Sequence, residues 1–349
     1  MVNLQTQKKS EVGVLAEYIS EELSIFIVAE NKASIHPANG GLRLLNYESD
    51  IECLRDGFRL ANLMKNKHNI YSTGFSGGKV VARSNNISCV KDKLISKTSE
   101  LLKKLNGRMI TGCDLNTNLA DMEKLFKLTP HVLAAVNSEV DASKTTARGV
   151  IGAFEAFRSS YPYDLSNGVL VHGAGSVGSI VAAELVKRDI KTFLVDIDIE
   201  KTYIPGVISL GNDKKWFHKN FDVIFPCSIS GLINTNISQY LLSTKAIISA
   251  ANAPFSNDVI PEKLIKSNTI IIPDPLVNAG AVIADSIEKY SPDAWHNCEP
   301  EQIYNFVQDE VRKKCFAYLA MYQSGLNSKE ILDLMQNEKS EIIGKTFLN

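Results

Sequence analysis

The sequence predicts an α/β protein of two domains, with a doubly wound parallel sheet in the second. Its 349 residues exceed one ordinary domain of ~100–150 residues. Its 44% hydrophobic and 22% charged residues are typical of a globular chain. In its second half, short apolar runs alternate with segments long enough for crossover helices. We expect an N-terminal α/β domain over residues 1–137, a second domain over residues 138–325, and a helical tail over residues 326–349 that packs on the first domain.

The first domain combines predicted strands with predicted helices. Apolar runs predict strands over residues 24–30 and 79–82. Helical spacing of apolar residues predicts helices over residues 50–64 and 91–106. Asp50 is the expected N-cap of the first helix, because its carboxylate can accept backbone N–H groups.

The second domain is predicted to repeat strand–helix units after a helix over residues 146–157. The predicted strands start at intervals of roughly 20 to 30 residues, which leaves room for a crossover helix and implies a parallel sheet. After Asn278 the chain is predicted to be helical. The predicted strands are residues 169–173, 192–195, 222–226, 246–250 and 269–272.

Charge and composition exclude several classes of function. Lys and Arg number 38 against 39 Asp and Glu, so no basic excess is left to neutralise nucleic-acid phosphates. No apolar run approaches the ~18 residues of a membrane span. The N-terminal sequence lacks a secretory signal, so we expect a cytoplasmic protein. The cysteines and histidines show no ligand spacing, so no metal site is expected.

The segment Gly173-Ala-Gly-Ser-Val-Gly178 matches the pattern G-x-G-x-x-G. It follows an apolar run, opens a helical segment and precedes a second strand that ends in Asp196, 21 residues after Gly175. Such glycines permit a tight turn, close approach of a pyrophosphate and close helix–strand packing, and the helix N-terminus attracts phosphate. The pattern predicts a Rossmann-type dinucleotide-binding domain. Asp196 would accept the ribose hydroxyls and repel a 2′-phosphate, which favours NAD; Asp198 is the alternative acid.

Two basic segments of the first domain lie beside glycines. They are Asn39-Gly-Gly-Leu-Arg43 and Gly74-Phe-Ser-Gly-Gly-Lys79. A P-loop at Lys79 would need glycine at position 73 and Ser or Thr at position 80, and the chain has Thr73 and Val80. The S-x-x-K pattern of penicillin-binding enzymes, which Ser76 and Lys79 fit, lies on a helix, where paired glycines are unfavourable. We expect the glycines to let backbone and ligand approach each other near Lys79.

Nine stretches, in order, resemble the Glu/Leu/Phe/Val amino-acid dehydrogenases, and within them the leucine/phenylalanine/valine/tryptophan branch. The intervals of 12 residues from Lys67 to Lys79 and of 35 residues from Lys79 to Asp114 agree with that branch. Two departures alter the neighbourhood of the lysines: Met64-Lys-Asn replaces the usual Met-Thr-Tyr, and Ser76 replaces a glycine. The matching stretches are residues 40–43, 60–67, 77–79, 111–118, 146–149, 173–178, 225–228, 250–252 and 277–280.

The resemblance implies NAD-dependent oxidative deamination of an L-amino acid to a 2-oxo acid, ammonia and NADH. Lys79 is similar to the catalytic lysine, Asp114 to the acid that exchanges protons with the substrate amine, and Lys67 to the lysine that binds the substrate carboxylate. Further substrate contacts are expected from Gly40, Gly41, Asn252 and Asn278. The residues expected at the cofactor are Arg43, Thr146, Gly173, Gly175, Ser176, Val177, Gly178, Asp196, Ile197, Cys227, Ser228, Ala250 and Asn252. The resemblance also implies a homo-oligomer, a dimer or an octamer.

The proposed chemistry independently requires these residue types. A lysine acts as a base near neutral pH only if burial and a second cation lower its pKa, and we expect Lys67 to be that cation for Lys79. Asp114 supplies a second proton-transfer group with a different pKa.

The substrate side chain is expected to meet polar residues. In the resembling family two positions that line it are usually apolar; here they correspond to Asn39 and to the pair Val282 and Asp285, three residues apart on one predicted helix face. A buried, unpaired carboxylate facing hydrocarbon is costly, so the pocket favours a polar or cationic side chain over leucine or valine. The alternative is that Asp285 points to solvent or pairs with a basic neighbour.

Two other functions stay open from the sequence. One is a non-catalytic or weakly active NAD-binding regulatory homologue on the same fold. The other is a hydroxy-acid dehydrogenase, which would use a histidine such as His131 or His172.

Overall fold

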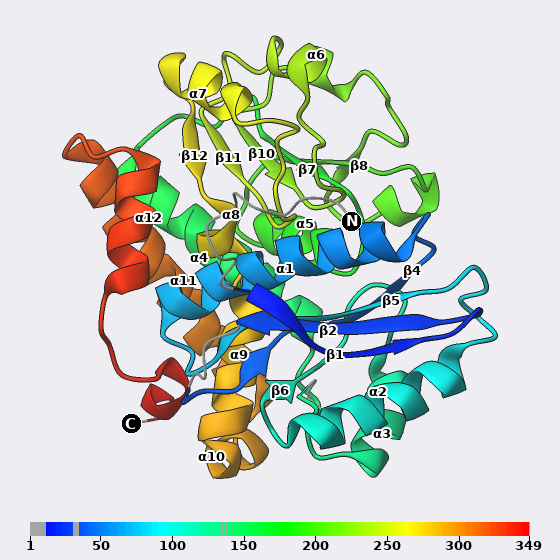
Figure 1. The fold of residues 1–349 in the computed structure, drawn as a ribbon. Helices are drawn as coiled ribbons and strands as arrows, with labels where there is room; N and C mark the ends of the chain where they lie inside the picture. Colours follow the sequence, from blue (N-terminus) through cyan, green and yellow to red (C-terminus); the bar gives the residue numbers. More distant parts are fainter. Residues whose placement is uncertain (1–11, 31–34, 134–135, 137, 349) are drawn as a thin grey trace, which may run out of the picture. The chain divides into compact units, whose positions relative to one another are not determined.

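The computed structural model describes residues 12–30, 35–133, 136 and 138–348, which form two compact units (Figure 1). Unit 1 contains the described residues up to Ser138, Asp285–Pro292 and residues 336–348. Unit 2 contains Glu139–Ala284 and Asp293–Met335. The units differ from the expected domains, because Ser138 and residues 285–292 belong to unit 1 and residues 326–335 belong to unit 2.

Unit 1 is built on a mixed sheet in the order β1-β2-β5-β3-β6, with β4 also paired to β5. β1, β2 and β5 are antiparallel neighbours, whereas β3 and β4 run parallel to β5 and β3 runs parallel to β6. The strands are β1 (Val12–Ile19), β2 (Ser24–Glu30), β3 (Ala38–Asn39), β4 (Leu42–Leu45), β5 (Ser76–Arg83) and β6 (Met109–Ile110).

Helices cover both faces of this sheet, with α1 (Asp50–Tyr71) on one side and α2 (Lys91–Leu105) and α3 (Leu119–Leu128) on the other (Figure 1). Because both faces are covered, nearly every residue of β2 is buried, which explains its uninterrupted apolar sequence. On β5, Val80 packs in the cluster on the α2 side and Val81 in the cluster on the α1 side. Side chains alternate along a strand, so Lys79 shares the α1 face with Val81.

Two local expectations in unit 1 were wrong. The N-cap of α1 is Ser49, whose hydroxyl accepts the N–H of Glu52, and Asp50 is the first helical residue. The helix also continues to Tyr71 instead of ending near Met64, because the polar run that follows Met64 is helical too. β1 was not predicted, and most of its residues are only partly buried or exposed.

Unit 2 contains a wholly parallel sheet in the order β12-β11-β10-β7-β8-β9, with the first strand, β7, in the middle. The chain therefore winds to one side of β7 and then to the other, as the sequence predicted. Ligands of such sheets bind at the carboxyl ends of the strands where the winding reverses, here at β7 and β10. The strands are β7 (Val169–His172), β8 (Thr192–Val195), β9 (Ile208–Ser209), β10 (Val223–Pro226), β11 (Ala246–Ile248) and β12 (Ile270–Ile272).

Within unit 2, α4 (Ala142–Ser160) and α11 (Pro300–Gln323) lie against each other so closely that a Cβ at Gly152 would come 2.2 Å from the carbonyl oxygen of Gln308. α9 (Gly280–Tyr290) starts in unit 2, and its last residues belong to unit 1. In the described part of the chain, no helix is long and apolar enough to cross a membrane. The remaining helices are α5 (Gly178–Val186), α6 (Thr235–Ser238), α7 (Val259–Lys266), α8 (Asp274–Val277), α10 (Pro292–Asn297), α12 (Ser328–Asn337) and the short 3-10 turns Ile199–Thr202, Trp216–His218 and Ile343–Thr346.

Candidate functional site

Three predicted site residues meet in unit 1: Lys79, Asp114 and Arg43. The Lys79 Nζ donates to Oδ2 of Asp114 in a close ion pair. The Arg43 guanidinium donates to both oxygens of the same carboxylate, at 3.1 Å from Nε and 3.3 Å from Nη2. The Lys79 side chain is 6% exposed and that of Arg43 13%, so the three charges interact largely out of contact with water.

Arg43 is held in turn by a second carboxylate. Its Nη1 donates to Asp56 of α1 at 3.2 Å, and Asp56 also accepts from Tyr47 and Arg59. Burial alone would raise the pKa of Asp56, but these hydrogen bonds and the charge of Arg43 lower it. The Arg43 guanidinium thus lies between two carboxylates, and its expected contact with the cofactor stays a prediction.

The cluster sets the protonation of its members. Burial lowers the pKa of Lys79 most, the charge of Asp114 opposes that shift, and the charge of Arg43 adds to it. Burial would raise the pKa of Asp114, but Lys79 and Arg43 hold it well below its usual range. Asp114 is therefore a carboxylate, and Lys79 loses its proton more readily than an exposed lysine. Arg43, rather than the expected Lys67, is the cation that contributes most to this lowering.

Lys67 lies in the last turns of α1 and is 7% exposed. Its positive charge contributes to the low pKa of its neighbour His68, although burial of His68 is the larger cause. Lys67 is thus a buried lysine of unit 1. It belongs to α1, the helix that covers the sheet face on which Lys79 lies.

The glycines of unit 1 let chain segments approach one another. A Cβ at Gly40 would lie 1.9 Å from the carbonyl oxygen of Gly78, and one at Gly41 would lie 2.4 Å from that of Cys113. Gly77 is similarly close to the backbone of α1, at 2.4 Å from the carbonyl oxygen of Ala61. Gly77 is thus required for packing on α1, and Gly40 and Gly41 bring β5 and the Asp114 loop together. The expected approach of a ligand near Lys79 stays a prediction.

Asn39 and Asp285 form a polar pair in the same unit. The Asn39 side chain is 1% exposed and hydrogen-bonds Asp285, while its Oδ1 has no partner among the described residues. Burial raises the pKa of Asp285 to about 7, and the bond from Asn39 opposes that rise. No ion pair joins Asp285 to a basic side chain in the part of the chain that the structure describes. Asp285 therefore neither points freely to solvent nor finds the basic neighbour considered above.

In unit 2 the glycine segment forms the tight turn between β7 and α5. Gly173 has a φ of +105°, and a Cβ at Gly178 would lie 1.9 Å from the carbonyl oxygen of Gly173, so both positions need glycine. A Cβ at Gly175 would meet nothing within 4 Å. Among the described residues, the N–H groups of Gly175 and Ser176 have no acceptor, as expected of a turn that binds an anion.

Asp196 lies at the end of β8 and contacts this turn. Its carboxylate accepts the N–H of Ala174 at 2.6 Å and that of Asp198 at 2.9 Å. Asp196 lines a cavity of about 370 Å³ with Ile197, Trp216 and His172. Ile197 is 94% exposed, an apolar side chain that is left uncovered beside the cavity. The turn, the acid and the uncovered apolar surface fit a dinucleotide.

The other expected cofactor residues that follow strands of unit 2 lie just after the carboxyl ends of β10 and β11. A Cβ at Gly173 would lie 2.8 Å from the Ser228 side chain, and burial raises the pKa of the Cys227 thiol to about 12. Asn278 donates to the carbonyl oxygen of Ala250 and to Oδ1 of Asn252, both at 3.0 Å. The structure thus joins Asn252 and Asn278 to each other. Two further predicted residues lie in helices of unit 2. The Thr146 hydroxyl donates to the carbonyl oxygen of Ala142 in α4, and Val282 is buried in α9.

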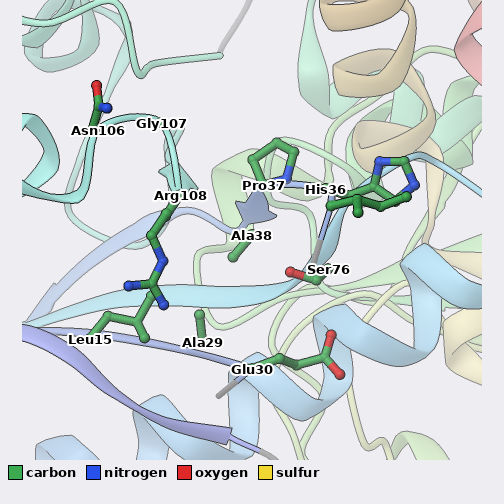
Figure 2. A pocket seen from close by; sticks show the side chains of 11 residues that line it. Leu15, Ala29, Glu30, His36, Pro37, Ala38, Ser76, Asn106, Gly107 and Arg108 are labelled. Carbon is green, nitrogen blue, oxygen red and sulfur yellow. The ribbon is translucent and has the colours of Figure 1, made fainter. Parts of the chain in front are cut away.

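Figure 2 shows a different cavity of unit 1, of about 300 Å³, with Arg108 on one side and Ser76 and Glu30 on the other. Neither Lys79 nor Asp114 lines it. The reactive groups therefore belong to the Lys79 cluster rather than to this cavity. No group of three or more metal-ligating side chains occurs among the described residues.

Sequence reasoning missed the residues that orient the cluster. Asp56 and Tyr47 hold Arg43, and Arg43 is separated from Asp114 by 71 residues. His68, next to Lys67, bonds Thr73 and the backbone of Asn39. No local pattern links Arg43 to Asp114 or His68 to Asn39, because the members of these two pairs come together only when the sheet of unit 1 forms.

Fold and site together define a class of protein: α/β dehydrogenases that combine a dinucleotide-type sheet with a separate unit carrying a buried lysine–carboxylate pair. Residues 194–339 match the family described as Glutamate/Leucine/Phenylalanine/Valine dehydrogenase. The chain is 31% identical over 283 residues to a phenylalanine dehydrogenase of Caldalkalibacillus thermarum, covering 76% of this chain and 75% of the relative. It is 29% identical over 300 residues to a leucine dehydrogenase of Geobacillus stearothermophilus, covering 81% and 79%.

The crystal structure of L-tryptophan dehydrogenase from Nostoc punctiforme has the same fold, with a TM-score of 0.72, 23% identity and 93% of each chain covered. The chain belongs to the Glutamate/Leucine/Phenylalanine/Valine dehydrogenase family and is an amino-acid dehydrogenase, an oxidoreductase. This membership removes the hydroxy-acid dehydrogenase alternative.

Proposed function

We propose that the protein catalyses the NAD-dependent oxidative deamination of an L-amino acid to a 2-oxo acid, ammonia and NADH, and the reverse reductive amination. The observation that carries the proposal is the buried Lys79–Asp114 pair with Arg43 bound to the same carboxylate. A buried lysine of lowered pKa beside an ionised acid supplies the two proton-transfer groups that deamination needs.

NAD is the proposed cofactor, and when bound it accepts the hydride from the substrate Cα. The N–H groups of the turn from Gly173 to Gly178, including those of Ser176 and Val177, would hold its pyrophosphate. Asp196 would accept the ribose hydroxyls, and its charge disfavours the 2′-phosphate of NADP. Ile197 would cover the base, and the remaining cofactor contacts are proposed for Thr146, Cys227, Ser228, Ala250 and Asn252.

The substrate carboxylate is proposed to bind Lys67 and the backbone of Gly40 and Gly41. In the described residues the N–H of Gly41 has no acceptor, which leaves it available to an anion. Asn252 and Asn278 of unit 2 are proposed to contact the amine and carboxylate.

The acid–base steps follow from the cluster. Asp114 would take a proton from the substrate ammonium, and loss of the Cα hydride would then leave a protonated imine. Lys79, as the neutral amine, would remove a proton from the water that attacks the imine carbon. As Asp114 returns its proton to the nitrogen, the C–N bond would break and the proton of the new hydroxyl group would pass to solvent water, so that ammonia leaves and the 2-oxo acid remains. Because Lys79 and Arg43 favour the carboxylate form, Asp114 would hold that proton only transiently.

The substrate side chain is proposed to be polar, and cationic rather than aliphatic. Asp285 has a half-buried carboxyl with no basic partner in the described residues, and Oδ1 of Asn39 also lacks a partner. A donor or a positive charge from the substrate would satisfy both groups, whereas hydrocarbon would leave them unpaired. Val282, one turn before Asp285 in α9, is proposed to contact the aliphatic part of that side chain.

The deciding experiment is a panel of the twenty L-amino acids with NAD or NADP, read as absorbance of the reduced cofactor, and of 2-oxo acids with ammonia in reverse. We expect turnover with NAD, highest for lysine, ornithine or arginine. No reduction in either direction would favour the regulatory homologue. A clear preference for leucine or valine would refute the polar pocket alone, and the pair Asp285→Val and Asp285→Asn would test it directly, with only the first expected to restore leucine activity.

A homo-oligomer is proposed as well. β1 is an edge strand of the unit 1 sheet, and its Val14 and Ile19 are exposed. An uncovered edge with apolar side chains is a surface that a second copy could cover. Light scattering that gives the mass of a single chain would refute this.

A further inference from the structure

His68 is a buried histidine that the proposed reaction does not use. It follows Lys67 in α1 and is 1% exposed. Its Nε2 lies 3.3 Å from the carbonyl oxygen of Asn39, and its Nδ1 lies 2.7 Å from the hydroxyl oxygen of Thr73. Thr73 itself is fully buried, so neither partner is replaced by water.

The two partners determine which nitrogen of the ring carries the proton. Burial lowers the pKa of His68 to about 3, so the ring is neutral and has one donor and one acceptor. The carbonyl of Asn39 can only accept, and therefore Nε2 must carry the hydrogen. Nδ1 then accepts from the Thr73 hydroxyl. This assignment uses every hydrogen-bonding group of the ring.

The hydrogen bond from His68 holds the first of two successive peptide groups, the one between Asn39 and Gly40. The carbonyl of Asn39 accepts from His68, and the N–H of the same peptide, on Gly40, donates to the carbonyl oxygen of Ile110 at 3.4 Å. The next carbonyl, that of Gly40, accepts from the buried hydroxyl of Thr111 at 2.9 Å. A trans peptide directs its N–H opposite to its carbonyl, so the N–H of Gly41 points away from Thr111 and has no acceptor in the described residues.

The residues that contact His68 opposite Asn39 are themselves held in place. The Thr73 carbonyl accepts from Ser286 of α9 at 2.7 Å, and the Ser286 hydroxyl accepts the N–H of Gly344 at 3.0 Å. The His68 ring packs against Phe75 with their centroids 5.5 Å apart. The ring therefore cannot rotate without breaking its contacts to Asn39, Thr73 and Phe75.

We propose that His68 is a positioning residue: through its Nε2–H it orients the Asn39–Gly40–Gly41 backbone so that the N–H of Gly41 faces the substrate carboxylate. This rests on the proposed function, because the carboxylate is the ligand that the oriented backbone serves. His68 itself does not contact the substrate and acts through the Asn39 carbonyl.

The test compares His68→Gln, His68→Asn and His68→Leu. The amide nitrogen of Gln reaches the position of Nε2 and can donate to Asn39, whereas that of Asn reaches only the position of Nδ1. We expect His68→Leu and His68→Asn to raise the KM of the amino acid about 10-fold, with the KM of NAD unchanged and kcat altered less, as one lost hydrogen bond predicts. His68→Gln should stay within about 3-fold of wild type.

A core variant separates positioning from stability. Leu94→Ala removes a buried side chain from the α2 side of the sheet, away from His68, and lowers the melting temperature without touching the network. We expect it to leave the KM of the amino acid unchanged. A KM rise as large as that of His68→Leu, or equal behaviour of the Gln and Asn variants, would overturn the proposal.

Nitrogen-15 NMR of the histidine rings in the wild-type protein provides a readout that needs no turnover. We expect His68 to show the neutral Nε2–H form throughout pH 5–8, and an Nδ1–H form or titration in that range would overturn the proposal. Absence of wild-type turnover with every amino acid would refute the proposed function, and the positioning role with it. Normal turnover together with a wild-type KM in His68→Leu would refute the positioning role alone.

Discussion

The two candidate sites are built in different ways. The nucleotide site of unit 2 is a short contiguous turn whose polar groups are backbone N–H groups and whose shape depends on glycines. The acid–base site of unit 1 joins Arg43, Lys79 and Asp114, which are far apart in the sequence and interact through their side-chain charges. The first site should therefore be sensitive to added volume, and the second to lost charge.

The largest effect is expected from Lys79→Ala. Loss of the base should lower kcat ~10³-fold or more, while the affinity for NAD, whose proposed site lies in unit 2, stays unchanged. Lys65→Ala is the matched control, since Lys65 pairs with Glu30 in the same unit. Stopped-flow turnover and NAD titration would measure both quantities. Near-normal turnover of the Lys79 variant would remove that residue from the mechanism.

Arg43→Gln tests whether the charge of Arg43 lowers the pKa values of Lys79 and Asp114. The loss of a hydrogen bond to a charged group, worth ~1.5–3 kcal/mol, should lower kcat about 10- to 100-fold. Arg43 lowers the pKa of both Lys79 and Asp114, so its removal should move both limbs of the pH–rate profile to higher pH. Arg59→Gln, which loses only a bond to Asp56, is the control. An unshifted profile in Arg43→Gln would contradict the charge coupling.

Gly175→Ala tests the sensitivity of the nucleotide turn to volume. Its new Cβ meets nothing in the protein, so the melting temperature should stay within ~1 °C of wild type while the KM of NAD rises about 10-fold. Gly178→Ala should also lower the melting temperature, because its Cβ would collide with the carbonyl of Gly173. Unchanged NAD affinity in Gly175→Ala would place the pyrophosphate elsewhere.

The smallest expected effect is on stability, at Asp285. The pKa of Asp285 in the folded protein, about 7, lies above its value in the unfolded chain. The protonated carboxyl therefore leaves the folded state more stable at low pH, and this stability is lost as the pH rises through about 7. Asp285→Asn should therefore raise the melting temperature at pH 8 by ~2–4 °C and leave it nearly unchanged at pH 4. Calorimetry at the two pH values would decide, and equal shifts at both would show that ionisation is not the cause.

The difference between the sites also explains what could be predicted from the sequence. The turn at Gly173–Gly178, its strand and Asp196 follow a local pattern, so β7, α5 and β8 were located correctly. Lys79 and Asp114 were identified only through the resemblance to a family, since nothing between residues 79 and 114 indicates that they meet. The role of Arg43 at Asp114 was missed, because it depends on the pairing of β4 with β5. The edge strand β1 was missed because half-buried strands lack a clear apolar pattern.

The division of the chain into units has a consequence for biosynthesis. The path passes between the units at residues 138/139, 284/285, 292/293 and 335/336. When residues 1–138 have left the ribosome, Ser286 and Gly344, which complete the network around His68, have not yet been made. At ~5–20 residues per second, the wait for residues 336–348 is roughly 10 to 40 s. During that time unit 2 can fold most of its sheet, so the unit that starts first should be the one that finishes last.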